Sequence, residues 1–265
     1  MDHHNLKFII RDLVQLTSNR QRESLSGANW YYFLHIPKTA GTSFRFSLYN
    51  YFSPKLVYPH TVEYYLKNKS QYISWSDFIE QESGNFPHRK KLLIGHFGLN
   101  PLDHYHEHLP KTLCFLRDPV KRVISTVVYH QQKKRKFANM TIDQILDKHL
   151  LREGNLQSIY FGYDLQKDNR QETLDNLKKL EFVGISEQFD RSLKLCNRIF
   201  NWDLKPVKPR NVGKYKISNF TNEQINRIKN STNIDRILYN TAVDIFNRRC
   251  KEFNVQSHRA FKRKR

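Results

Sequence analysis

Short apolar runs alternate along this chain with segments in which apolar residues recur every three or four positions. The apolar runs at residues 30–36, 92–94, 112–116 and 181–185 are typical of buried strands, because each is short and ends at turn or polar residues. Strands that alternate with helices favour a parallel sheet with helices packed on both faces. We therefore expect a three-layer α/β fold with a central parallel sheet.

Amphipathic segments follow most of these runs and predict the helices of the fold. They lie at residues 42–52, 119–128, 189–200 and 234–245. Asp118 is suited to cap the second helix, with Pro119 at its first position, and Ser186 is expected to cap the third. The segment at residues 205–214 is the clearest loop.

Length and composition predict one domain. The chain has 265 residues, 38% of them hydrophobic, which is enough for one sizeable core at about residues 30–250, followed by a basic tail at residues 254–265. No apolar stretch approaches the ~18 residues of a membrane span, and residues 1–13 do not resemble a signal peptide. We expect a soluble, cytoplasmic protein without a transmembrane segment. The three cysteines are widely spaced, so reduced thiols are expected.

The charge balance favours polyanionic partners. Lys and Arg total 45 against 25 Asp and Glu, a formal net charge of +20, which suits nucleic acids, anionic lipids, phosphorylated or sulfated ligands and acidic glycans. The basic runs at residues 133–136 and 261–265 are consistent with a nucleic-acid-binding protein, but such runs are usually solvated surface or tail. Nucleic-acid binding therefore stays an alternative, and no nucleic-acid partner is expected.

Residues 35–43 (HIPKTAGTS) join the first predicted strand to the first amphipathic helix. Free N–H groups at the helix start, the helix dipole, several hydroxyls and the Lys38 ammonium together form a cradle for a phosphate. The loop is not a Walker A motif, in which Lys directly precedes a hydroxyl residue, because here Lys38 precedes Gly41. The pattern predicts phosphate binding, and the missing Walker A motif argues against the alternative function, a nucleotide-dependent kinase.

Residues 115–125 (FLRDPVKRVIS) form a second junction between a strand and a helix. Arg117 leaves its strand at the same edge of the predicted sheet as the first loop, and Ser125 lies two turns into the following helix. A guanidinium and a hydroxyl in this arrangement can hold a second phosphate.

Both motifs resemble those of sulfotransferases that use 3′-phosphoadenosine 5′-phosphosulfate (PAPS), in the branch of heparan sulfate 2-O-sulfotransferases and bacterial relatives. The similarity spans roughly residues 30–250 and implies a P-loop-like sulfotransferase fold. It also implies that the first loop wraps the donor 5′-phosphate, that Arg117 and Ser125 grip the 3′-phosphate, and that Lys214 lies nearby, although a plain surface loop is the alternative for Lys214. The first-loop residues are Lys38, Thr39, Ala40, Gly41, Thr42 and Ser43. Two such sites specify a 3′,5′-bisphosphate.

His96 is the candidate general base. It follows the predicted strand at residues 92–94, which places it beside both phosphate loops, and histidine is suited to accept a hydroxyl proton near neutral pH. GHFGL at residues 95–99 resembles the family segment with the catalytic histidine. Relatives that act on uronic acids carry a second histidine where this chain has Ile94, so the acceptor stays open. A structural role for His96 is the alternative.

The sequence offers one weaker candidate for a metal site. His104, His106 and His108 alternate and could point together if their segment were extended, but no complete ligand set accompanies them, so no metal is expected. Asn155 and Gln157 resemble a family segment on the acceptor side or, alternatively, satisfy backbone groups.

The predicted activity is metal-independent transfer of a sulfuryl group from PAPS to a hydroxyl of a glycan or a small natural product. The resemblance implies that adenosine 3′,5′-bisphosphate leaves while Lys38 stabilises the bridging oxygen.

Overall fold

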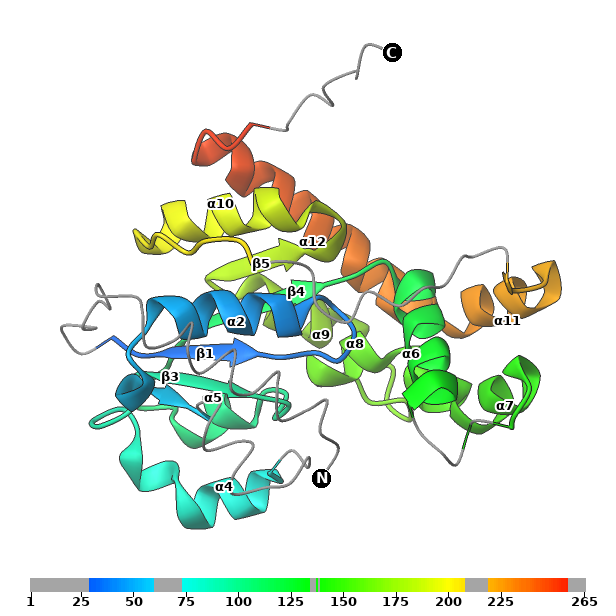
Figure 1. Cartoon of the computed structure of the whole chain (residues 1–265), viewed down its shortest axis with the longest axis horizontal. Helices are drawn as coiled ribbons and strands as arrows, with labels where there is room; N and C mark the ends of the chain where they lie inside the picture. The colour runs from blue at the N-terminus through cyan, green and yellow to red at the C-terminus, as the bar shows by residue number, and fades with distance from the viewer. Residues whose placement is uncertain (1–28, 60–72, 134–136, 138, 208–218, 257–265) are drawn as a thin grey trace.

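The computed structural model describes residues 29–59, 73–133, 137, 139–207 and 219–256 and contains a parallel β-sheet flanked by helices (Figure 1). The sheet has five strands in the order β2-β3-β1-β4-β5, and every neighbouring pair is parallel. The strands are β1 (Tyr31–Leu34), β2 (Val57–Tyr58), β3 (Leu92–Gly95), β4 (Lys111–Leu116) and β5 (Phe182–Ile185). The predicted parallel α/β sheet is thus confirmed, and the two-residue strand β2 is an addition to it.

Helices cover both faces of the sheet, as the alternating directions of the β1 side chains show. On one face, the Tyr31 ring lies 5.6 Å from Phe200 of α10 (Phe189–Phe200), and Phe33 lies 4.8 Å from Phe44 of α2 (Gly41–Tyr51), measured between ring centroids. On the other face, the Tyr32 hydroxyl donates a hydrogen bond to the Gly98 carbonyl, close to α5 (Asn100–His104). Both faces are therefore buried, as expected for a parallel sheet.

The helices at all four predicted positions are present. α2 and α10 agree with the prediction within one residue, and the second and fourth predicted helices are α6 (Pro119–Lys133) and α12 (Asn233–Glu252). Asp118 caps α6, since its Oδ1 accepts a hydrogen bond from the Lys121 amide at 2.9 Å. The other α-helices in the described residues are α4 (Trp75–Gln81), α5, α7 (Ile142–Glu153), α8 (Leu156–Tyr160), α9 (Arg170–Lys178) and α11 (Asn222–Ser231). Among the described helices, none combines the length and apolar character needed to cross a membrane.

Two groups of buried apolar side chains stabilise the described parts of the chain. The larger surrounds the sheet and includes Phe33, Phe44 and Phe115, all fully buried. The smaller lies between α6, α7 and α11 and includes Ile124, Ile145 and Ile228. The larger group makes the sheet a rigid platform, so the loops at its edge leave from fixed positions.

Candidate anion-binding site at the sheet edge

The carboxyl ends of β3, β1, β4 and β5 lie next to one another in the sheet. Leu34 at the end of β1 pairs with Gly95 of β3 and with Cys114 of β4, and Leu116 of β4 pairs with Ile185 of β5. The residues that follow these strands are therefore brought to one edge, where parallel α/β sheets bind their ligands. They include His96, the loop at residues 35–43 and Arg117.

The loop after β1 has an unusual backbone. Lys38 and Ala40 both adopt left-handed conformations, with φ of 68° and 65°, although neither is glycine. Such conformations cost energy and are concentrated at functional sites, and left-handed residues in a turn aim successive N–H groups into an anion-binding concavity. Thr39 is fully buried between them and donates its hydroxyl to the Ile36 carbonyl at 2.9 Å. Its side chain therefore stabilises the loop, and its backbone amide is the group that remains for a ligand.

The first turn of α2 continues this loop. Gly41, Thr42 and Ser43 open the helix after Ala40, whose side chain makes no capping hydrogen bond, and no acidic residue lies in the first turn. A helix start of this kind carries partial positive charge on its N–H groups. Gly41 is required sterically, because a Cβ atom at this position would lie 2.0 Å from Cδ2 of His35. The buried His35 ring thus fixes how closely the loop approaches β1.

Lys38 supplies the positive charge of this loop. Its Nζ lies 4.3 Å from the centroid of the Tyr129 ring on α6, which gives a cation–π contact. Burial, and then the nearby Arg117 charge, lower the pKa of Lys38 to about 8. An anion at the loop would offset both effects by adding negative charge beside the ammonium.

Arg117 connects the second motif to the first. Its Nη1 donates to the Lys38 carbonyl at 3.1 Å, while its Nε lies 3.9 Å from Oε1 of Glu187. Glu187 also accepts hydrogen bonds from the Asp118 amide and the Tyr239 hydroxyl, at 3.2 and 3.1 Å. The guanidinium therefore lies between the first loop and an acidic side chain that follows β5.

Ser186 joins the two motifs and corrects the expectation that it caps a helix. Its hydroxyl lies 2.7 Å from the Thr39 carbonyl and 2.9 Å from the Leu116 carbonyl, and it has one proton to donate to these two acceptors. The residue before α10 is Gln188, which makes no side-chain cap. Because Thr39 and Leu116 are separated along the chain, a residue after β5 that contacts both of them holds the two loops at a fixed distance.

His96 lies where the sequence placed it, directly after β3. Its Nδ1 is hydrogen-bonded to the His35 carbonyl. A carbonyl only accepts, so we assign the proton to Nδ1, which leaves Nε2 as the basic nitrogen. The His96 ring stacks on His35 with centroids 4.4 Å apart, and Tyr160 approaches it edge-on at 6.4 Å.

The two stacked histidines are neutral near pH 7. Burial is the largest cause that lowers the pKa of His96 to about 4; the positive charge of Arg45 lowers it further, while the hydrogen bond to the His35 carbonyl opposes the shift. Burial also holds the pKa of His35 well below its usual value, with smaller effects from His96 and Arg45. A neutral His96 can accept a proton at Nε2.

The remaining predicted residues lie in different settings. Ser125 is buried within α6, two turns from Arg117, as its spacing predicted. His104 ends α5, and His106 and His108 follow in a turn, so their segment is not extended, and the described residues contain no cluster of three metal-ligating side chains. Lys214 and residues 208–214 of the predicted loop lie outside the described residues.

Asn155 and Gln157 satisfy backbone groups, the alternative considered from the sequence. Asn155 Oδ1 accepts from the amides of Ile234 and Asp235 at the start of α12, both at 3.1 Å. Gln157 is fully buried and bonds to the backbone of Arg117 at 2.9 and 3.0 Å. No local pattern predicts this contact or those made by Ser186 and Glu187, because the partners lie at least 40 residues apart.

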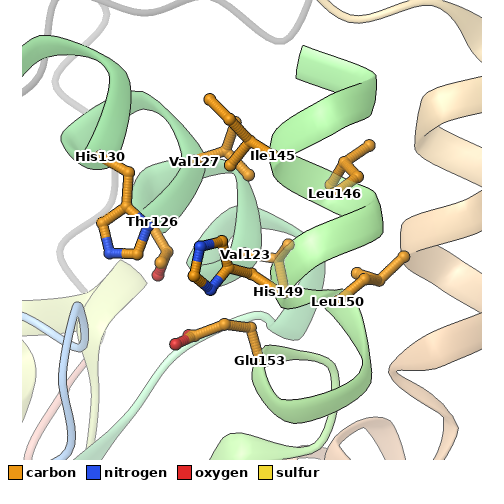
Figure 2. A pocket seen from close by; sticks show the side chains of 9 residues that line it. All are labelled: Val123, Thr126, Val127, His130, Ile145, Leu146, His149, Leu150 and Glu153. Carbon is orange, nitrogen blue, oxygen red and sulfur yellow. The ribbon is translucent and has the colours of Figure 1, made fainter. Parts of the chain in front are cut away.

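A small cavity lies between α6 and α7, lined by side chains from both helices (Figure 2). The rings of His130 and His149 approach there with centroids 5.0 Å apart, and Glu153 forms an ion pair with the buried Arg122 at 3.0 Å. The volume is about 10 Å³, enough for about one water molecule. This cavity is too small for a nucleotide, so the candidate ligand site remains the sheet edge.

A scan against protein-family models and a search of curated proteins found no match to this chain. The fold and the sheet-edge residues define a parallel α/β protein with a candidate site for anionic ligands.

Proposed function

We propose that this protein is a PAPS-dependent sulfotransferase with a P-loop-like sulfotransferase fold. The observation that carries the proposal is the pairing of two cationic motifs: the Arg117 guanidinium contacts the carbonyl of Lys38 within the strained loop after β1. Two adjacent sites for phosphate groups suit a 3′,5′-bisphosphate nucleotide. We identify this nucleotide as PAPS because both motifs resemble those of PAPS-dependent enzymes.

In the proposed reaction, an acceptor hydroxyl attacks the sulfur atom of PAPS. The bond between sulfur and the bridging oxygen of the 5′-phosphate breaks, the hydroxyl proton passes to Nε2 of His96, and adenosine 3′,5′-bisphosphate leaves. Lys38 and the backbone amides of residues 39–43 stabilise the negative charge on the departing phosphate, which is preorganised electrostatic catalysis. The reaction needs only the fixed cations of the two motifs and the neutral His96.

The proposed acceptor is a hydroxyl of a glycan or a small natural product. The net charge of +20 suits an acidic glycan, although donor binding uses part of this charge. A kinase is the rival enzyme, and a basic nucleic-acid-binding protein is the rival without catalysis. The kinase predicts tight binding of ATP, whereas nucleic-acid binding predicts an affinity that falls steeply with salt.

Isothermal titration calorimetry with adenosine 3′,5′-bisphosphate and ATP tests the proposal. We expect micromolar binding of the bisphosphate and much weaker binding of ATP. In Arg117→Ala, the lost charged contact should raise the Kd of the bisphosphate by about 10- to 150-fold, which corresponds to about 1.5–3 kcal/mol.

Arg227→Ala is the matched control, because this substitution removes the same charge at a different place. Arg227 lies on α11 and forms ion pairs with Asp143 and Asp147 of α7. A wild-type protein that does not bind the bisphosphate, or equal losses in the two variants, would refute the proposal. A positive result would justify screening acceptors with PAPS and testing His96→Asn for loss of turnover.

A further inference from the structure

The backbone of Arg117 is held by a single side-chain amide. The Arg117 N–H donates to Oε1 of Gln157 at 2.9 Å, and Nε2 of Gln157 donates to the Arg117 carbonyl at 3.0 Å. One amide thus pairs with both backbone groups of one residue, as a neighbouring strand would at the end of β4. These two hydrogen bonds restrict the backbone dihedrals of Arg117 and therefore the direction in which its side chain leaves.

Gln157 is itself anchored to a buried carboxylate. Oδ2 of Asp235 accepts hydrogen bonds from the backbone N–H of Gln157 at 3.1 Å and from the side-chain Nε2 of Gln157 at 3.4 Å. Oδ1 accepts from the amide and hydroxyl of Ser158 at 2.7 and 2.8 Å. Asp235 is fully buried in the first turn of α12, so its carboxylate fixes the start of α8 and the Gln157 side chain together.

The helices α8 and α12 cap each other, which makes this anchor rigid. Asp235 on α12 accepts from amides at the start of α8, while Asn155 before α8 accepts from two amides at the start of α12. Each helix thereby satisfies N–H groups of the other that have no partner within their own helix. The backbone of Gln157 is thereby held at the start of α8, so its side chain leaves from a fixed position next to Arg117.

We infer that Gln157, anchored by Asp235, is a positioning residue that aims the Arg117 guanidinium at the 3′-phosphate of the donor. The inference rests on the proposed function. Two contacts then complete the aim at the far end of the side chain, namely the Lys38 carbonyl at Nη1 and Glu187 at Nε. A guanidinium whose backbone and side-chain end are both held has a fixed position and direction, which favours a phosphate at one defined distance from the first loop.

If Gln157 has this role, its substitution should weaken only the part of the binding affinity that the 3′-phosphate contributes. Adenosine 5′-monophosphate lacks that group, so the ratio of its Kd to that of adenosine 3′,5′-bisphosphate measures the contribution of the contacts to the 3′-phosphate, including that of Arg117. Gln157→Met keeps the size of the side chain and removes both hydrogen bonds to Arg117. We expect this variant to lower the ratio by roughly 2- to 13-fold, the worth of about one net hydrogen bond, while the Kd of the monophosphate changes little.

The experiment compares wild type, Gln157→Met, Arg117→Ala and the double variant by calorimetry with both nucleotides. Gln224→Met is the control, because Gln224 is another buried glutamine whose side chain bonds to Asp143 of α7 and to the amide of Thr221, the N-cap residue of α11. In the Arg117→Ala background, Gln157→Met should have no further effect on the ratio, since the aimed group is absent. Gln157→Asn, whose side chain is one methylene shorter and does not bring its amide to the Arg117 backbone, is the second variant if the first does not fold.

The outcomes separate the inference from the function on which it rests. A lowered ratio in Gln157→Met, absent from the control and from the Arg117→Ala background, supports the positioning role. An unchanged ratio, or equal losses for both nucleotides, overturns it and leaves Gln157 as a structural residue while the proposed function stands. A wild-type protein without preference for the bisphosphate overturns both.

Discussion

Binding of adenosine 3′,5′-bisphosphate, the product that the proposed donor leaves, should be coupled to proton uptake by Lys38. In the free protein the pKa of this side chain is about 8, because the ammonium is partly buried and lies near Arg117. A phosphate dianion within about 4–6 Å favours the charged form and raises such a pKa by about 1–3 units. The protonated fraction of Lys38 therefore increases on binding, and the protein takes up protons.

The size of the uptake follows from these values. Near pH 8 about half of the Lys38 side chains are neutral in the free protein, so binding should take up roughly 0.4–0.5 proton per site. Near pH 7 less than about 0.1 proton is expected, because Lys38 is already charged. The affinity for the bisphosphate should fall as the pH rises above about 8, since each binding event then requires a proton.

Calorimetry in buffers of different ionisation enthalpy measures this uptake directly. Lys38→Arg is the control, because a guanidinium keeps its charge throughout this pH range and takes up no proton. The phosphates of the ligand titrate near pH 6 and contribute little near pH 8. If wild type and Lys38→Arg take up the same number of protons near pH 8, the proton does not go to Lys38, and the assignment of this residue to the phosphate loop is refuted.

Three further substitutions test the construction of the site. Gly41→Ala should lower the free energy of unfolding by about 1–3 kcal/mol, because the new methyl group overlaps the His35 ring, whereas Gly84→Ala, with no atom within 4 Å, should have little effect in the same thermal unfolding experiment. Ser186→Ala should lower stability by about 0.5–1.5 kcal/mol and weaken bisphosphate binding in calorimetry; full retention of affinity would show that the two loops keep their distance without it. Glu187→Gln keeps an oxygen acceptor near Nε of Arg117 and removes a negative charge beside the proposed site, so bisphosphate binding should strengthen by about two- to threefold at low salt and less at high salt; weaker binding would mean that the charge of Glu187, and not only its acceptor oxygen, is needed to aim the arginine.

The sequence predicted the elements whose pattern is local. The four longer strands and the helices α2, α6, α10 and α12 follow from short apolar runs and from apolar stripes. α4, α7 and α11 were missed, yet each begins with a capping box that the sequence displays, at Ser74 with Asp77, Thr141 with Gln144 and Thr221 with Gln224. These start signals would have found the three helices.

The candidate site was predictable only in part, for a physical reason. Strand ends and helix starts place Lys38, Arg117 and His96 at one edge, because parallel strands carry their carboxyl ends to the same side. The groups that hold them come from distant segments: Ser186 contacts a loop 147 residues earlier, and Gln157 contacts a backbone 40 residues earlier. Such contacts depend on how the helices pack, and no local pattern encodes them.

The electrostatics of the site connect donor binding to the candidate base. Burial lowers the pKa of both Lys38 and His96, and in each case a nearby arginine lowers it further. Burial is the larger cause in both cases, and an anion bound at the sheet edge would oppose both shifts by favouring the charged forms. A pKa of about 4 makes His96 a weak base in the free protein, and the proposed donor, if it binds beside His96, would raise that pKa towards the range in which a histidine accepts a hydroxyl proton efficiently. The bound donor would thus improve the base that acts on its own sulfuryl group, and an NMR titration of His96 with and without the bisphosphate would detect the shift.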